Sequence, residues 1–464
     1  MRIHILGICG TFMGGIAALA KAAGHEVSGS DASVYPPMST QLETLGIRLH
    51  EGYRAEHLQP APDLVVVGNA LSRGNPAIEA MLERGLPYVS GPQWLAENIL
   101  AGRHVLAVAG THGKTTTSSM LAWILESAGL KPGFLIGGVA TDFGISARLG
   151  GAGDSRESAA PFVLEADEYD TAFFDKGSKF LHYRPRTAIL NNLEYDHADI
   201  FPDLASIETQ FHYLIRTVPG NGLLVVNAAD HNLARVLEKG CWTPRASFAL
   251  ERGDWSAAGM TEDGSAFDVL HQGRPVASVR WNLLGAHNVQ NALAAIAAAQ
   301  HLGVTAELAA AALGRFQGVK RRLEVRAQIA GVTVYDDFAH HPTAIATTLA
   351  GLRKHVGKAR IVAVLEPRSN TMKTGVHRDR LADSLQDADR VFVHQAQDVH
   401  WDVAGALRAL GSRASVTRDI AQLVDGIVAE LQRGDHVLVM SNGGFGGLHE
   451  KLAERLERNA APHC

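Results

Sequence analysis

Cysteine is scarce in this sequence: 464 residues include only Cys9, Cys241 and Cys464, far apart in the chain. Three cysteines cannot form a disulfide framework, and their spacing matches no zinc-ligand pattern. A chain with so few thiols is simplest to place in a reducing compartment, so we expect a cytoplasmic protein.

Long apolar runs are also missing. None approaches the roughly eighteen residues that a membrane-spanning helix needs. The first twenty residues are apolar after Arg2, as in a signal peptide, but four glycines interrupt them, so a strand, a turn and a helix fit better. Those glycines are Gly7, Gly10, Gly14 and Gly15.

Strong charge of either sign is absent as well. The formal net charge is -5, 20% of residues are charged, and no basic run occurs. Nothing therefore indicates binding to nucleic acid or to an anionic membrane, and small-molecule partners are expected. With 46% hydrophobic residues the composition is that of a globular protein, and a length of 464 residues favours two to four domains.

The most informative stretch runs from His104 to Ser118 (HVLAVAGTHGKTTTS). An apolar strand leads through two glycines into a segment with helical spacing of apolar residues. Such a loop can hold the phosphates of a nucleotide, because converging N–H groups and the helix N-terminus attract anions. We therefore expect ATP or GTP to be bound by Gly110, Thr111, His112, Gly113, Lys114, Thr115 and Thr116.

Within this loop, Lys114 would neutralise the transferring phosphate and Thr115 would bind Mg²⁺. The usual pattern has a further glycine where this chain has Val108, so the loop is a variant. The alternative interpretation is a glycine-rich turn with a surface lysine.

The rest of the chain alternates short apolar strands with helical stretches, which predicts parallel sheets covered by helices. We predict an α/β fold of three domains. Residues 1–102 would form a Rossmann-like parallel sheet, 103–317 a central P-loop ATPase-type domain, and 318–464 a second Rossmann-like domain. The second boundary lies at the basic link 318–323 (GVKRRL). Residues 150–160 should be a loop, and 246–282 a hairpin region.

The first glycine loop, residues 7–15 (GICGTFMGG), is not a dinucleotide fingerprint, because Cys9 and Phe12 stand where glycines are required. A nicotinamide oxidoreductase is therefore a poor alternative. A nucleotide diphosphate still fits at the start of a helix that we expect from about Ile16. Glycines that would permit its close approach are Gly10, Gly14 and Gly15.

Two polar residues near strand ends of this first domain are further candidates for ligand binding. Asp31 could accept a hydrogen bond from a ribose or base, or be simply a polar residue at a strand end. Asn69 follows the third strong strand, at the edge where open sheets bind ligands.

Two later strands end in polar clusters. The stretch 161–170 (PFVLEADEYD) passes from apolar residues into four acids, a usual place for a Mg²⁺ ligand, although a solvated acidic loop would look similar. After the strand at 187–193, His197 could bind a second metal or be an ordinary loop histidine. Farther on, Asn288 and Asn291 share one face of a helix, where Asn288 could also be only a helix cap.

Three strands of the last domain also end in polar clusters, at 336–342 (DDFAHHP), 366–373 (EPRSNTMK) and 441–447 (SNGGFGG). Because ligands bind beyond the carboxyl ends of strands in open sheets, this domain should face a ligand too.

Taken in order, the phosphate loop, the EADEYD and NLEYDH segments, the HNVQN helix start, the Arg321–Arg322 link and the DDFAHHP cluster resemble the Mur ligase family across essentially the whole chain. These enzymes build the peptide stem of bacterial peptidoglycan by ATP-dependent amide-bond formation. The resemblance implies ATP and Mg²⁺ as cofactors. It also implies catalytic roles for Lys114, Glu165, His197 and Arg322.

The resemblance further implies that Thr115 and Glu165 hold one Mg²⁺ and that His197 holds a second. Asn288 and Asn291 would contact the adenine. Arg322 and Asp337 would reach the phosphate and ribose when the last domain closes. Several family members use a carbamylated lysine after the Asp-His pair, but this chain has no lysine between His197 and Leu237.

Within the family, the resemblance is greatest to the branch that joins UDP-N-acetylmuramate to a recycled, diaminopimelate-containing tripeptide. The segments 7–15, 35–39, 366–373 and 440–447 carry it, and Met1 stands close to the first strand, whereas the branch that adds L-alanine usually has a leader. The L-alanine branch is the alternative. The expected contacts to the acidic peptide are His340, His341, Arg368, Asn370 and Lys373, each of which could instead be a solvated surface residue.

An alternative from another class is a nucleotide-dependent switch or binding protein. It would hydrolyse ATP slowly whether or not an amine acceptor is present.

Overall fold

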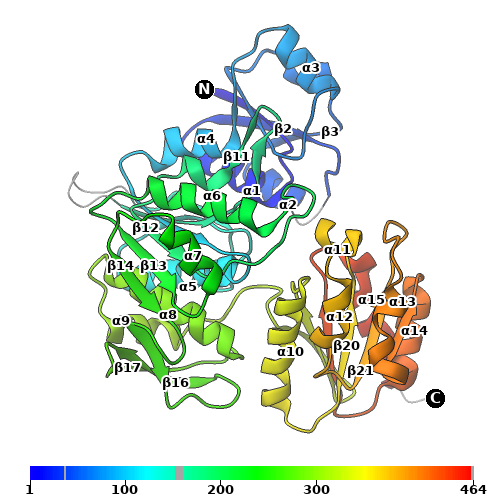
Figure 1. Cartoon of the computed structure of the whole chain (residues 1–464). Helices are drawn as coiled ribbons and strands as arrows, with labels where there is room; N and C mark the ends of the chain where they lie inside the picture. The colour runs from blue at the N-terminus through cyan, green and yellow to red at the C-terminus, as the bar shows by residue number, and fades with distance from the viewer. Residues whose placement is uncertain (36–37, 152–159, 461–464) are drawn as a thin grey trace.

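The protein is described by a computed structural model that covers residues 1–35, 38–151 and 160–460. Residues 152–159 of the expected loop, residues 36–37 of the 35–39 segment and Cys464 lie outside the described residues. Figure 1 shows three α/β bodies, each built around its own sheet.

The first body has a five-stranded, wholly parallel sheet with strand order β3-β2-β1-β4-β5. Its strands are β1 (Arg2–Leu6), β2 (Glu26–Asp31), β3 (Arg48–Glu51), β4 (Leu64–Val67) and β5 (Tyr88–Ser90). Its helices are α1 (Thr11–Ala22), α2 (Met38–Thr44), α3 (Pro76–Glu83) and α4 (Gly91–Leu95), with short turns η1 (Ala55–Leu58) and η2 (Ala96–Leu100). The central strands read as apolar runs because helices cover both faces of the sheet. The predicted Rossmann-like sheet is confirmed.

Helix α1 begins at Thr11, five residues before the predicted start at Ile16, so that prediction is wrong. Glycine is a weak helix former, which is why the pattern placed Gly14 and Gly15 outside the helix. Both are instead buried within it. A Cβ on Gly14 would lie 2.5 Å from the sulfur of Met38, and one on Gly15 would collide with Leu135. Close packing therefore explains these glycines.

The second body has a ten-stranded mixed sheet, ordered β17-β16-β15-β14-β13-β12-β6-β9-β7-β8. Its strands are β6 (His104–Ala109), β7 (Gly133–Leu135), β8 (Ala147–Arg148), β9 (Pro161–Ala166), β12 (Thr187–Leu190), β13 (Leu223–Asn227), β14 (Arg245–Phe248), β15 (Trp255–Ala258), β16 (Ala266–His271) and β17 (Arg274–Arg280). Its helices are α5 (Lys114–Ser127), α6 (Leu204–Thr217), α7 (His231–Glu238), α8 (Ala286–Gln300) and α9 (Ala306–Leu313). A small hairpin of β10 (Asp170–Ala172) and β11 (Asp175–Ser178) precedes η3 (Lys179–His182). The expected hairpin region is the antiparallel set β15–β17.

The register of three neighbouring strands positions the site. Ala109, the last residue of β6, pairs with Ala166 at the end of β9 and with Leu190 at the end of β12. The segments that follow these three strands therefore leave the sheet side by side. They are the glycine loop, the acidic cluster and the segment that contains His197.

The third body has a six-stranded sheet, ordered β18-β19-β23-β20-β21-β22, which is parallel except for the edge strand β18. Its strands are β18 (Glu324–Ile329), β19 (Val332–Asp337), β20 (Ile361–Leu365), β21 (Arg390–His394), β22 (Ala414–Thr417) and β23 (His436–Met440). Its helices are α10 (Pro342–Val356), α11 (Asn370–Thr374), α12 (Arg378–Ser384), α13 (Val403–Ala406), α14 (Ile420–Glu430) and α15 (Leu448–Ala460), with η4 (Arg408–Arg413) and η5 (Phe445–Gly447). The second predicted Rossmann-like sheet is confirmed.

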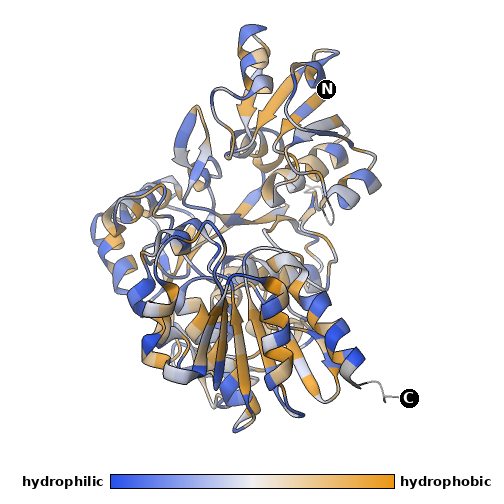
Figure 2. Cartoon of the chain, turned by 90° about the vertical axis from the view of Figure 1, so that its right-hand side faces the viewer, coloured by the Kyte–Doolittle hydropathy of each residue, from blue (hydrophilic) through white to orange (hydrophobic). Residues whose placement is uncertain are grey.

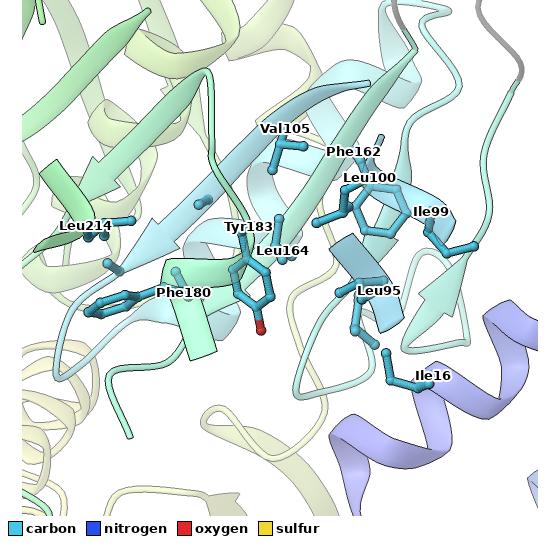
Figure 3. Close-up of a cluster of buried hydrophobic side chains, with 14 of the residues drawn as sticks. Ile16, Leu95, Ile99, Leu100, Val105, Phe162, Leu164, Phe180, Tyr183 and Leu214 are labelled. Atoms are coloured by element: carbon cyan, nitrogen blue, oxygen red, sulfur yellow. The ribbon is translucent and has the colours of Figure 1, made fainter. Parts of the chain in front are cut away.

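The three bodies are not joined equally. One apolar cluster runs from the first body into the second, where Ile16 and Leu95 pack towards Leu164 (Figure 3). Among the described residues, the apolar clusters of the third body contain nothing before Leu323. Figure 2 shows its apolar strands enclosed by helices with polar outer faces. The first two bodies thus share a core, whereas polar contacts hold the third.

Within the described ranges, no helix has both the length and the apolar character needed to cross a bilayer.

Candidate active site

The glycine loop lies between β6 and α5, as the sequence predicts. Gly110 has a φ of 149° and Gly113 a φ of 78°, conformations that suit glycine. A Cβ on Gly110 would lie 2.9 Å from the Asn191 side chain. The loop lines a cavity of about 590 Å³ where the three bodies meet.

Lys114 points from this loop towards the acidic cluster. Its ammonium donates to the Gly110 carbonyl at 2.8 Å and lies 3.0 Å from Oε2 of Glu168 and 3.7 Å from Oδ1 of Asp167. Burial opposes the charged form of Lys114, but these carboxylates outweigh it and raise its pKa. The lysine is therefore a buried, permanent cation at the mouth of the phosphate loop.

Glu168 is a site residue that sequence reasoning missed. Its side chain is only 2% exposed, and its second oxygen lies 3.6 Å from Nε2 of His197. Glu168 thus joins Lys114 to His197. The four acids between Glu165 and Asp170 carried this signal, but only the fold shows that Glu168 is buried while Asp167 and Tyr169 beside it are partly exposed.

Glu165 lies at the end of β9, where the Gly137 N–H donates to its Oε1 at 2.6 Å. Burial, and then the charge of Asp167, raise its pKa, while a hydrogen bond with Thr115 acts in the opposite direction. Glu165 and Asp167 are carboxylates that lie close to each other and to the Thr115 hydroxyl. Oxygen donors of this kind suit Mg²⁺. Thr115 and Glu165 therefore offer oxygen donors that fit one Mg²⁺, whereas His197 lies apart from them, beside Glu168.

The start of α8 contributes an amide cluster. Asn291 donates to Oδ1 of Asn288 at 3.4 Å and accepts from Nδ2 of Asn191 at 3.3 Å. The helix is capped by Gly285, so the alternative of Asn288 as the cap does not hold. Both asparagines line the cavity, together with His287.

Two residues from the third body reach into the same cavity. The Arg322 guanidinium lies 3.4 Å from the Thr115 hydroxyl and 5.2 Å from the ring centroid of Phe338. Asp337 accepts from the N–H groups of Leu323 and Ala339, each at 2.7 Å. Phosphate loop and third body therefore meet at this position. Phe338, which packs on the arginine, has no obvious signal in the sequence.

The predicted peptide contacts lie in two places. His340 lines the cavity, and burial lowers its pKa to about 4, so its ring is neutral. His341 lies behind it as the N-cap of α10. Arg368 lies near Glu366, Asn370 donates to Asp199 at 2.8 Å, and Lys373 pairs with Asp398 at 2.7 Å. Asn370 and Lys373 lie in α11 and Arg368 lies just before it, and none of the three lines the cavity.

The first body contributes Thr11 and Phe12 to the cavity, but not its predicted contacts. Asp31 accepts from the Cys9 N–H at 2.9 Å and so holds the first glycine loop. This role matches the alternative of a polar strand-end residue. Asn69 is exposed after β4. The predictions that Gly10, Gly14, Gly15, Asp31 and Asn69 bind substrate stay predictions.

Lys179, which the sequence did not suggest, joins the first and second bodies beside the cavity. The buried Lys179 ammonium lies 4.6 Å from the ring centroid of Phe12 and 4.2 Å from that of Tyr169. It also lies 3.6 Å from Oδ2 of Asp167. Lys179 therefore pairs with Asp167 while it packs on Phe12 at the start of α1.

Three family models match successive parts of the chain. They are the Mur ligase family, catalytic domain, over residues 2–103, the Mur ligase middle domain over 108–299, and the Mur ligase, glutamate ligase domain, over 321–443.

Individual relatives extend this match over nearly the full length. The UDP-N-acetylmuramate–L-alanyl-gamma-D-glutamyl-meso-2,6-diaminoheptandioate ligase of Escherichia coli is 57% identical, with 99% of each chain covered. A UDP-N-acetylmuramate–L-alanine ligase of Roseiflexus castenholzii is 36% identical, with 96% of this chain and 95% of the relative covered. The solved murein peptide ligase of Psychrobacter arcticus is 49% identical, with a TM-score of 0.77 over 99% of this chain and 100% of that one. The strand-end cavity and these full-length similarities lead to one conclusion: the chain belongs to the Mur ligase family.

Proposed function

We propose that the protein joins UDP-N-acetylmuramate to the tripeptide L-alanyl-gamma-D-glutamyl-meso-diaminopimelate with ATP and Mg²⁺, in the recycling of peptidoglycan. The observation that supports this most is the 57% identity over 99% of both chains with the tripeptide ligase of Escherichia coli. The L-alanine ligase of Roseiflexus castenholzii is more distant, at 36% identity.

The chemical need is activation of a carboxylate. A carboxylate resists amines until one oxygen becomes a good leaving group, and phosphorylation by ATP provides that group. The amino group of the tripeptide, on its L-alanine residue, then attacks and forms a tetrahedral centre. Phosphate leaves as the amide bond forms. Such a reaction depends on positioning and on stabilisation of negative charge.

The residues of the second body suit this task. Lys114 would neutralise the transferring phosphate, and its present partner Glu168 keeps the ammonium buried and charged. Thr115 and Glu165 would hold one Mg²⁺, and His197 a second. These ions would supply positive charge that offsets the negative charge of the reacting groups.

The third body would complete the site on closure. Asn288 and Asn291 would contact the adenine. Arg322 and Asp337 would contact phosphate and ribose from beyond the 318–323 link. His340 lines the cavity as a neutral ring, because burial lowers its pKa to about 4, and it would contact the peptide.

The acceptor peptide would lie against α11 and the DDFAHHP segment. A tripeptide with several carboxylates needs cationic partners, and an arginine can bind a carboxylate through two hydrogen bonds. Arg368 is half exposed and lies 3.7 Å from Glu366, so much of its guanidinium is available to a ligand. ATP and nucleotide-linked sugars are cytoplasmic metabolites, so we place the reaction in the cytoplasm.

The test is phosphate release from ATP with Mg²⁺ and UDP-N-acetylmuramate, compared between the tripeptide and free L-alanine. Stimulation by the tripeptide alone supports the proposal. Stimulation by L-alanine alone would assign the protein to the biosynthetic branch, and slow hydrolysis that ignores both acceptors would favour a nucleotide switch.

A further inference from the structure

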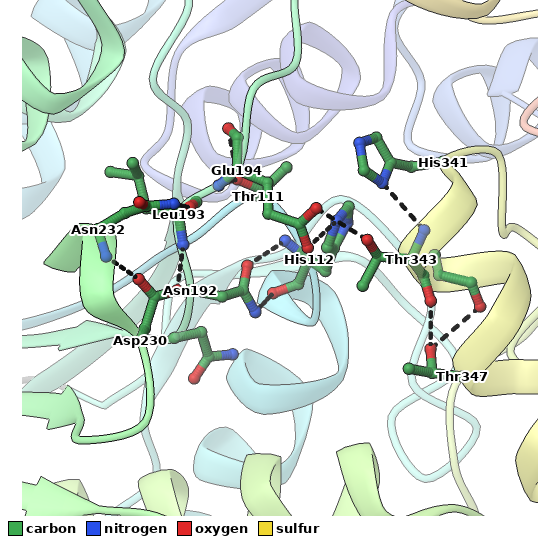
Figure 4. A network of polar contacts seen from close by, with 12 residues as sticks. Thr111, His112, Asn192, Leu193, Glu194, Asp230, Asn232, His341, Thr343 and Thr347 are labelled. Atoms are coloured by element: carbon green, nitrogen blue, oxygen red, sulfur yellow. Dashed lines mark hydrogen bonds and ion pairs between the residues drawn. The ribbon is translucent and has the colours of Figure 1, made fainter. Parts of the chain in front are cut away.

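Two histidines and a glutamate meet where the second and third bodies touch, beside the proposed magnesium ligands but apart from them. They are His112 of the phosphate loop, Glu194 after β12 and His341 at the start of α10 (Figure 4). One ligand atom from each residue lies within 4.8 Å of the other two. In the part of the chain that the structure describes, this is the one group of three such side chains gathered so closely.

The spacing of the group suits a small four-coordinate ion. Nε2 of His112 lies 3.5 Å from Oε1 of Glu194. Zinc bonds to nitrogen and oxygen are about 2.0–2.2 Å, so neighbouring ligands of a tetrahedral ion are about 3.4 Å apart. An ion could therefore sit between these two atoms with little movement.

His341 and Glu194 have the protonation states that a metal needs. Burial, and then the charge of His112, lower the pKa of His341 to about 3, so its ring is neutral. Glu194 is partly buried, which raises its pKa, but its contacts with His112 and Thr343 outweigh this and lower the pKa to about 2, so it is ionised. The neutral imidazole of His341 and the Glu194 carboxylate can bind a metal without first losing a proton.

The surroundings hold the ligands in place. Oε2 of Glu194 accepts from the Thr343 hydroxyl at 2.8 Å, which leaves Oε1 towards His112. The His112 N–H donates to Asn192 at 2.8 Å, so the backbone that carries the ring is fixed. Supporting hydrogen bonds of this kind are typical of built metal sites.

The histidines also lack other partners. Nε2 of His112 and Nε2 of His341 are buried and make no hydrogen bond within the described structure. His341 itself is 2% exposed. Buried ring nitrogens without partners are costly unless something binds there.

We propose that His112, Glu194 and His341 form a site for a zinc-class divalent ion, such as Zn²⁺ or Co²⁺, distinct from the magnesium site. Two imidazoles and one carboxylate favour such ions over Mg²⁺, which prefers oxygen ligands. Because one ligand belongs to the third body, a bound ion fastens that body to the phosphate loop. The ion therefore slows the opening that releases products and so inhibits turnover. Excess Mg²⁺ does not relieve this inhibition.

The test is titration of the metal-free, full-length protein with Co²⁺ in saturating Mg²⁺, followed by visible absorption. We expect one ion per chain with the intense spectrum of tetrahedral Co²⁺, displaced by Zn²⁺. His341→Gln should weaken binding at least about tenfold. The matched control is His377→Gln, whose ring lies 4.4 Å from that of His341 but outside the group, and which should bind as the unmodified protein does.

Failure of the unmodified protein to give that spectrum, or equal binding by His341→Gln, would overturn the proposal. If the variant does not fold, zinc-edge anomalous diffraction from crystals of the unmodified protein decides the question. A peak among the three side chains supports the site. A peak at His197 and Glu165 instead, or none, contradicts it.

Discussion

At the scale of single residues, Lys114 is the side chain on which the proposed chemistry most depends. Lys114→Ala should lower phosphate release at least about 100-fold, because the developing charge on the transferred phosphate loses its cation. Binding of UDP-N-acetylmuramate should persist, since we propose that the sugar nucleotide binds to the first body. The assay is phosphate release beside calorimetric titration of the sugar nucleotide. Lys176→Ala, which removes a lysine 68% exposed and paired with Asp170, is the control. Retained turnover in Lys114→Ala would remove the phosphate-loop assignment.

Arg368 tests the peptide site in the same way. Arg368→Ala should raise the KM for the tripeptide about tenfold or more, the value of one charge-assisted hydrogen bond, with little change in the KM for ATP. Steady-state kinetics with each substrate varied will show this. Arg378→Ala, which removes an arginine 63% exposed, should leave both values unchanged. An unaltered tripeptide KM in Arg368→Ala would place the peptide elsewhere.

Prediction from sequence worked best for residues fixed by local geometry. The glycine loop was predictable because Gly110 and Gly113 need conformations that few other residues adopt. Glu168 was not, because its value comes from lying between Lys114 and His197, which are distant in sequence. Asp31 shows the same limit, since its partner, the Cys9 N–H, belongs to another loop.

At the scale of elements, the junction of β6 and α5 depends on close approach to the end of β12. Gly110→Ala should cost about 1–3 kcal/mol and most of the activity, because the added methyl group meets Asn191 at 2.9 Å and the Asn192 N–H nitrogen at 3.2 Å. Thermal unfolding and phosphate release measure the two effects.

The control for that substitution lies inside a helix. Gly426→Ala in α14 meets only the Phe392 ring at 3.6 Å, an ordinary contact. It should stabilise the protein by up to about 1 kcal/mol, since alanine is the better helix former. If both variants behaved alike, steric closeness at Gly110 would not explain the loop.

Strands and helices were largely predictable because their apolar residues repeat with the period of each structure. The start of α1 was not. Local preference places Gly14 and Gly15 outside a helix, whereas packing against Met38 and Leu135 places them within it. The pairing of β6 with β9 and β12, which creates the site, also depends on contacts that no single segment encodes.

At the scale of the whole molecule, polar contacts attach the third body to the second. Movement of the third body must change these contacts. The Thr371 hydroxyl, on α11, donates to Asp196 at 2.7 Å and accepts from the Ala198 N–H at 3.3 Å. Thr371→Val should destabilise the observed arrangement of the second and third bodies by about 1–3 kcal/mol, because Asp196 and the Ala198 N–H lose a buried partner. Small-angle scattering with a non-hydrolysable ATP analogue and Mg²⁺ should therefore show a more open molecule.

Thr374 supplies the control for closure. Its hydroxyl donates to the Thr371 carbonyl within α11 at 2.8 Å, and within the described ranges it makes no hydrogen bond to the second body. Thr374→Val should scatter like the unmodified protein. Equal scattering from both variants, with kcat unchanged, would mean that this contact does not hold the third body.

The acceptor in the proposed ligation is a peptide and not a free amino acid. The most direct measurement is the mass of the UDP-linked product after incubation with ATP, Mg²⁺, UDP-N-acetylmuramate and equal concentrations of L-alanine and L-alanyl-gamma-D-glutamyl-meso-diaminopimelate. We expect a product that carries the whole tripeptide. A product that carries only L-alanine would contradict this expectation.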